Sequence, residues 1–121
     1  MPSNAPSRWT VHLKAYSGWM YIGIIGSTSG VSASSYSFAS SYGWAAGAVY
    51  IAGKENYGHG GWAGWDQGDE ATLTYNPLDH SLSMFLSRTG VTYRITGVNL
   101  SEAYIHVNLY RQNDRVRISL P

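Results

Sequence analysis

The stretch that decides the fold is Trp19-Met20-Tyr21-Ile22-Gly23-Ile24-Ile25, an unbroken apolar run near the start of the chain. It is far shorter than the roughly 20 residues that a membrane-crossing helix needs. Successive side chains of a strand point to opposite faces of its sheet, so a strand with one wet face shows polar residues at every second position. This run has none, which predicts a strand covered on both faces.

Outside this run, apolar and polar residues alternate in short segments. Trp9, Val11 and Leu13 alternate with polar residues, which predicts a half-buried strand. Similar patterns predict strands over 48–51, 71–75, 82–86, 91–95, 104–110 and 115–120. Turn residues separate these segments at 53–54, 76–79 and 88–90, and at Asn113-Asp114, where we expect a hairpin. Helical periodicity is nearly absent, so the pattern indicates an all-β fold, an antiparallel sandwich or barrel.

Length and composition exclude several classes of protein. The chain has 121 residues, of which 44% are hydrophobic, as expected for one folded domain with a single core. There is no cysteine, which excludes disulfides, thiolate metal sites and a cysteine nucleophile. The net charge is only +1, which argues against a nucleic-acid partner.

The N-terminal residues 1–7 lack the apolar centre of a signal peptide. We expect them to be a disordered or extended segment that precedes one domain at 8–121. No apolar run is long enough to cross a membrane, so no membrane partner is expected. Together with the missing cysteines, these features favour a cytoplasmic location.

Several segments resemble, in order, the motifs of SPRY domains. Trp19–Gly26 resembles the family's W-x-h-G-h-A strand, and Ser41-Tyr42-Gly43-Trp44 its s-W-G-W element. The similarity continues through Val49–Lys54 (l-Y-h-n-G-k), Gly68-Asp69, Asp79–Phe85, Ala103–Tyr110 and Arg115–Ile118, so order and spacing agree over roughly residues 9 to 120. The chain departs from the pattern in lacking Asn at the turn 87–90, the strands that usually precede Trp9, and a PRY segment.

The resemblance implies a bent, concanavalin-like β-sandwich of two antiparallel sheets in a single domain. It also implies a protein-interaction module without catalytic residues or cofactor. In that family, loops at one end of the sandwich capture a peptide or partner protein, often for a ubiquitin ligase.

Two long loops, 27–41 and 56–67, are the expected binding segments, because long loops on a rigid β scaffold carry function. Tyrosine and tryptophan make good anchors, since they bury a large area with few rotatable bonds. The candidate ligand-binding residues are Tyr36, Phe38, Tyr57, Trp62, Trp65, Tyr110 and Arg111, each aromatic having local packing as its alternative. In the resemblance, Tyr36 and Tyr110 fall beside the family's pocket. Trp9, Trp19 and Trp44 are expected in the core.

Catalytic and metal chemistry find little support. The four histidines match no compact metal motif, so we expect no bound metal. Asp66 and Asp69 are the acids best placed for a sugar cleft, but Asp69 follows Gly68 as in a turn whose carboxylate caps backbone N–H groups. We therefore expect no enzyme activity.

Two alternatives to peptide binding remain. A carbohydrate-binding sandwich would present Trp62 or Trp65 flat and exposed beside Asp66 or Asn56. Self-association through exposed edge strands is the other alternative, because an unpaired strand edge offers a template for another chain.

Overall fold

The computed structural model describes residues 7–16, 18–27, 35–110 and 112–120. Within these residues the chain forms ten strands and two short 3-10 turns. The strands are β1 (Ser7–Ala15), β2 (Met20–Ile25), β3 (Tyr42–Trp44), β4 (Ala48–Ile51), β5 (Lys54–Tyr57), β6 (Glu70–Asn76), β7 (Ser81–Leu86), β8 (Val91–Thr96), β9 (Tyr104–Leu109) and β10 (Arg115–Ser119). The turns are η1 (Ser35–Ser37) and η2 (His59–Gly61). Ser7 already belongs to β1, and the rest of the expected N-terminal segment lies outside the described residues.

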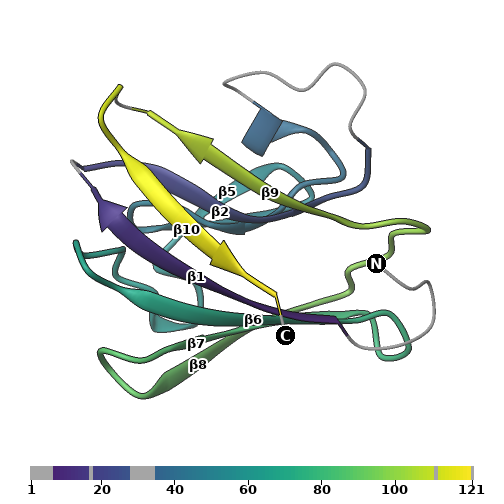
Figure 1. Cartoon of the computed structure of the whole chain (residues 1–121). Helices are drawn as coiled ribbons and strands as arrows, with labels where there is room; N and C mark the ends of the chain where they lie inside the picture. Colours follow the sequence, from purple (N-terminus) through teal and green to yellow (C-terminus); the bar gives the residue numbers. More distant parts are fainter. Residues whose placement is uncertain (1–6, 17, 28–34, 111, 121) are drawn as a thin grey trace.

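The strands form two sheets that lie face to face (Figure 1). Sheet A has the order β10-β1-β6-β7-β8, and sheet B has the order β5-β4-β3-β2-β9. All the paired strands within them are antiparallel. The predicted two-sheet antiparallel sandwich is therefore confirmed, and the barrel is excluded.

The core lies between the inner faces of the two sheets. Trp9, Val11 and Leu13 of β1 are all buried there, which confirms the strand that their alternation predicted. From sheet B, the alternate residues of β2 and the Trp44 indole fill the same layer. One buried layer flanked by two sheets is the usual solution for strands with one apolar face.

Every residue of β2 is buried, so the prediction of a strand covered on both faces is confirmed. On its outer face Gly23 lies opposite Gly43 of β3. A Cβ at Gly23 would lie 2.1 Å from the Tyr42 carbonyl oxygen, and one at Gly43 would lie 2.9 Å from Cζ of Tyr21. The Tyr21 ring thus lies against a glycine pair where no larger residue fits.

Two features of the topology differ from the sequence expectations. The turn before Asp114 is present, but β9 pairs with β2 in sheet B and β10 pairs with β1 in sheet A, so the expected hairpin is wrong. Each strand therefore hydrogen-bonds to a strand of a different sheet, and the turn joins the two layers. The alternation also missed β3, which has only three residues, and β5, because Lys54-Glu55-Asn56-Tyr57 is polar and lies at a sheet edge.

Candidate ligand-binding site

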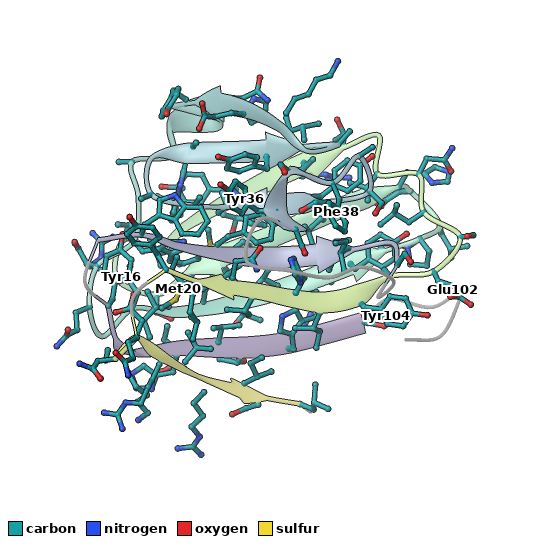
Figure 2. All side chains as sticks on the ribbon, turned by 90° about the horizontal axis from the view of Figure 1, so that it is seen from above. Tyr16, Met20, Tyr36, Phe38, Glu102 and Tyr104 are labelled. Atoms are coloured by element: carbon teal, nitrogen blue, oxygen red, sulfur yellow. The ribbon has the colours of Figure 1, made fainter. Side chains whose placement is uncertain are left out.

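The outer face of sheet B carries a row of aromatic side chains over the buried Tyr21. Tyr36, on η1, lies between Trp19 and Tyr50, with ring centroids 4.8 Å and 5.2 Å away. Its centroid is 6.3 Å from that of Tyr21, which lies below it. Figure 2 looks onto this face and shows Tyr36 over the strands of the sheet. Such tilted and edge-on ring pairs favour one fixed arrangement of the rings.

Tyr110 extends the row beyond the end of β9. Its ring meets the Trp19 ring edge-on, with centroids 6.3 Å apart. The Tyr110 side chain is 69% exposed, so most of the phenol surface remains available to a ligand. The structure therefore brings the predicted residues Tyr36 and Tyr110 together, with Trp19 between them.

Glu55 joins the other end of the row to Tyr57. The Tyr50 hydroxyl donates a 2.9 Å hydrogen bond to Oε2 of Glu55. Burial is the main cause that raises the pKa of the Tyr50 hydroxyl, and this hydrogen bond raises it further. Tyr50 therefore remains a donor. A hydrogen bond to the same carboxylate raises the pKa of Tyr57, whose side chain is 75% exposed. We call Tyr110, Trp19, Tyr36, Tyr50, Glu55 and Tyr57 the aromatic row.

Buried polar contacts fix the row from below. The Oδ1 atom of Asn108 accepts the Tyr36 backbone N–H at 3.0 Å, which ties η1 to β9. The same oxygen lies 3.1 Å from Nε2 of His106, which donates to it in the matching tautomer. Tyr21 is hydrogen-bonded to the buried Ser41 hydroxyl. Tyr36 is therefore positioned by its backbone as well as by ring packing.

Trp62 and Trp65 do not belong to this site. They are 2% and 4% exposed, with ring centroids 4.7 Å apart, and are part of the main core. Each indole N–H is already used, Trp62 donating to the Ala45 carbonyl at 2.7 Å and Trp65 to the Trp44 carbonyl at 3.2 Å. This burial corrects their place among the candidate ligand-binding residues. Local packing was the alternative for each loop aromatic, and it applies to these two. Burying a large apolar ring in the core gains more free energy than leaving it in water.

Two further candidates fall outside the aromatic row. Phe38 is half-buried on the segment after η1, and within the described chain it makes no ring contact with the row. Arg111 lies outside the described residues.

The acidic pair considered for a sugar cleft serves a structural purpose. Asp69 is buried, and its Oδ2 accepts the Asp66 backbone N–H at 2.7 Å, as expected for a capping carboxylate. Arg88 binds both acids, with Nε 2.7 Å from Oδ1 of Asp69 and a terminal nitrogen 3.2 Å from Oδ2 of Asp66. The exposed, flat tryptophan that a sugar site here would need is not found at Trp62 or Trp65.

Sequence reasoning missed three members of the aromatic row. Trp19 was expected in the core and Tyr50 in a plain strand, and no role was predicted for Glu55. The signal that could have found Tyr50 and Glu55 is the register of β4 and β5, which places the two residues opposite each other. Finding that register requires recognising β5 as a strand.

Comparison with known proteins identifies the fold. No family model matches the sequence, and no curated protein matches it. The crystal structure of the SPRY domain of human HERC1 is similar, with a TM-score of 0.75 at 16% sequence identity. The match covers 98% of this chain and 77% of that one. The chain therefore has the SPRY-like β-sandwich fold that its motifs indicate. Among the described residues, no helix has the length and apolar content needed to span a membrane.

Proposed function

We propose that this SPRY-like sandwich is a non-catalytic protein-interaction module that binds an extended peptide segment of a partner protein. The observation that carries the proposal is the aromatic row, whose ends at Tyr57 and Tyr110 are exposed while its centre is rigidly packed. Rigid aromatic anchors lose little conformational entropy on binding, which suits them to peptide recognition.

The chemistry of the row sets what a ligand would offer. Apolar side chains of a peptide would cover Trp19 and Tyr110, and the Glu55 carboxylate would accept hydrogen bonds from ligand N–H groups. The finer proposal is that the module is the substrate-recognition part of a ubiquitin ligase or another multidomain protein in the cytoplasm. It draws support from the likeness of the fold to SPRY domains.

The test compares wild type with Tyr110→Ala and Tyr57→Ala in affinity capture from lysate, followed by calorimetry with the purified partner. Truncating an aromatic anchor costs about 1–2 kcal/mol of binding free energy, a loss of roughly fivefold to thirtyfold in affinity. The matched control is Tyr104→Ala, at the other end of β9, where the exposed Tyr104 hydroxyl donates to Glu102 at 2.6 Å.

Loss of the partner by Tyr110→Ala or Tyr57→Ala, but not by Tyr104→Ala, supports the proposal. Equal capture by all three variants would contradict the placement of the site on the aromatic row. Capture only of glycoproteins that free sugar releases would contradict peptide binding and favour a carbohydrate ligand.

A further inference from the structure

Among the described residues, β10 has a neighbouring strand on one side only, and the register shows which of its backbone groups face the other side. The Leu13 N–H donates to the Asp69 carbonyl at 2.9 Å, so the peptide groups of Leu13 face away from β10. Peptide groups alternate along a strand, so those of His12 face β10, where Arg117 is its partner. The N–H and C=O groups of Val116 and Ile118 therefore point outward, away from β1.

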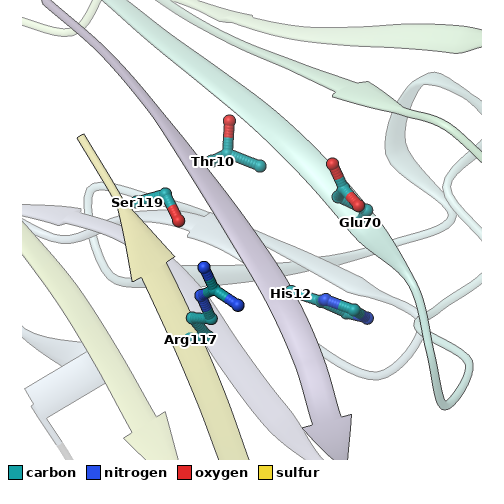
Figure 3. A pocket seen from close by; sticks show the side chains of 5 residues that line it. All are labelled: Thr10, His12, Glu70, Arg117 and Ser119. Atoms are coloured by element: carbon teal, nitrogen blue, oxygen red, sulfur yellow. The ribbon is translucent and has the colours of Figure 1, made fainter. Parts of the chain in front are cut away.

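The side chains on this edge divide by face. Ile118 lies opposite Val11 on the inner face but is 42% exposed, because β10 is the last strand of the sheet. On the outer face, Thr10, His12, Glu70, Arg117 and Ser119 line a polar hollow of about 210 Å³. Figure 3 shows these five side chains standing over β10, β1 and β6. Arg115 lies two residues before Arg117 and so shares its face.

Arg115 and Arg117 give this edge a positive charge, and a carboxylate, Glu70 of β6, lines the same hollow two strands away from β10. Residues 88–121 contain five arginines against Glu102 and Asp114. Arg88 is paired with Asp69 and Asp66, and Arg94 with Asp79 at 3.3 Å. Within the described chain, no ion pair or hydrogen bond is recorded for the Arg115 and Arg117 side chains.

A second copy of this chain is a poor occupant of the edge. Two β10 strands paired antiparallel about Val116 or Arg117 would gather Arg115 and Arg117 of both copies on one face. Like charges directly opposite each other destabilise a strand pair. A strand that carries carboxylates at alternate positions has the complementary pattern.

We propose that the β10 edge binds an extended acidic segment of a partner protein by strand addition, at a site separate from the aromatic row. The backbone of the segment pairs with Val116 and Ile118, while its carboxylates face Arg115 and Arg117. The carboxylates of the segment stay near β10, because Glu70 of β6 lines the far side of the hollow beside Arg117. Apolar residues on its other face cover Ile118.

The test titrates ¹⁵N-labelled protein with a blocked peptide in which glutamate and valine alternate, and with its lysine counterpart. We expect the glutamate peptide to shift the amide signals of Arg115–Ser119, and the lysine peptide to leave them unchanged. No shift with the glutamate peptide at millimolar concentration overturns the proposal, as does an equal response to both peptides.

Two variants then separate the backbone from the charge contribution. Ile118→Pro removes an outward N–H that has no partner in the sheet, which edge strands tolerate, and Ile118→Ala keeps it. We expect Ile118→Pro to bind at least tenfold more weakly than Ile118→Ala. If Ile118→Pro fails to fold, Arg115→Glu/Arg117→Glu carries the test, with Lys54→Glu on β5 as the charge control.

Full binding by the double charge reversal overturns the proposal. Sedimentation that shows wild type dimerising, and Ile118→Pro remaining monomeric, assigns the edge to a second copy and also overturns it. Because the peptide and variants address β10 alone, failure here leaves the proposed function of the aromatic row intact.

Discussion

His106 is a titratable side chain placed where its charged form is disfavoured. It lies on the outer face of β9 with its ring centroid 5.6 Å from that of Tyr21, and it is buried. Burial lowers the pKa of His106 from its usual value near 6.5, and the hydrogen bond to Asn108 only partly opposes this effect. The folded protein therefore holds His106 neutral at a pH where the unfolded chain takes up a proton.

This difference predicts a pH-dependent free energy of unfolding. The lowered folded-state pKa contributes stability that is present above about pH 6.5 and is lost as the pH falls toward that pKa. We expect wild type to lose stability between pH 7.5 and 5.5 more steeply than His106→Gln, measured by urea unfolding. His59→Gln, at an exposed loop position, serves as the control. Parallel pH profiles for wild type and His106→Gln would refute this assignment.

Alternation of apolar and polar residues predicts the burial of some single residues and not of others. Trp9 and Trp44 are buried as expected, Trp9 on a strand whose alternation identifies its inner face and Trp44 at the s-W-G-W position of the resemblance. Trp19 is only partly buried, since it precedes β2 and packs against Tyr36 and Tyr110, residues distant in sequence. The composition of a segment does not reveal which distant segment will cover it.

At the scale of elements, one buried carboxylate ties the segment before β6 to the turn after β7. Asp69 accepts hydrogen bonds from both the Arg88 guanidinium and the Asp66 backbone N–H. Arg88 is partly exposed, whereas the side chain of Asp69 is 1% exposed. Removing the cation leaves a buried carboxylate with a poorer set of donors, which is costly.

We expect Arg88→Ala to lower the free energy of unfolding by about 1.5–3 kcal/mol, the range for hydrogen bonds to charged groups. The matched substitution Arg94→Ala removes a partly exposed ion pair with Asp79 and should cost less than about 1 kcal/mol. Urea unfolding at neutral pH measures both. Equal losses for the two variants would show that the burial of Asp69 does not decide the strength of its ion pair.

The elements with strong local patterns were predicted correctly. The errors concern which strands pair, because that depends on segments far apart in the sequence. The alternation over β6 and β7, with turn residues at 76–79, predicts two strands and the turn between them from nearby residues alone, and these strands do pair. For β9 and β10 the local signal is equally good, yet their partners are β2 and β1. The aromatic row depends on such distant pairings, and for that reason only part of it was found.

Across the whole molecule, the two sheets do not have equally protected strands. The strands β2 and β3 lie inside sheet B, and every residue of both is buried, whereas β5 lies at the edge with mostly exposed residues. In sheet A, β1 is flanked on both sides and β10 on one side only. Amides that can open locally exchange at a lower free energy than amides that require global unfolding.

Hydrogen exchange followed by NMR should therefore rank the strands by position. We expect the amides of β2 and the inner part of β1 to exchange slowest, at a free energy close to that of global unfolding. Those of β5, and the outward amides of Val116 and Ile118 on β10, should exchange orders of magnitude faster, because they face water rather than a neighbouring strand. Protection of the Val116 and Ile118 amides equal to that of β2 would mean that the β10 edge is already covered in solution. The outward backbone groups of these two residues would then be hydrogen-bonded to another chain, and β10 would lie in an interface.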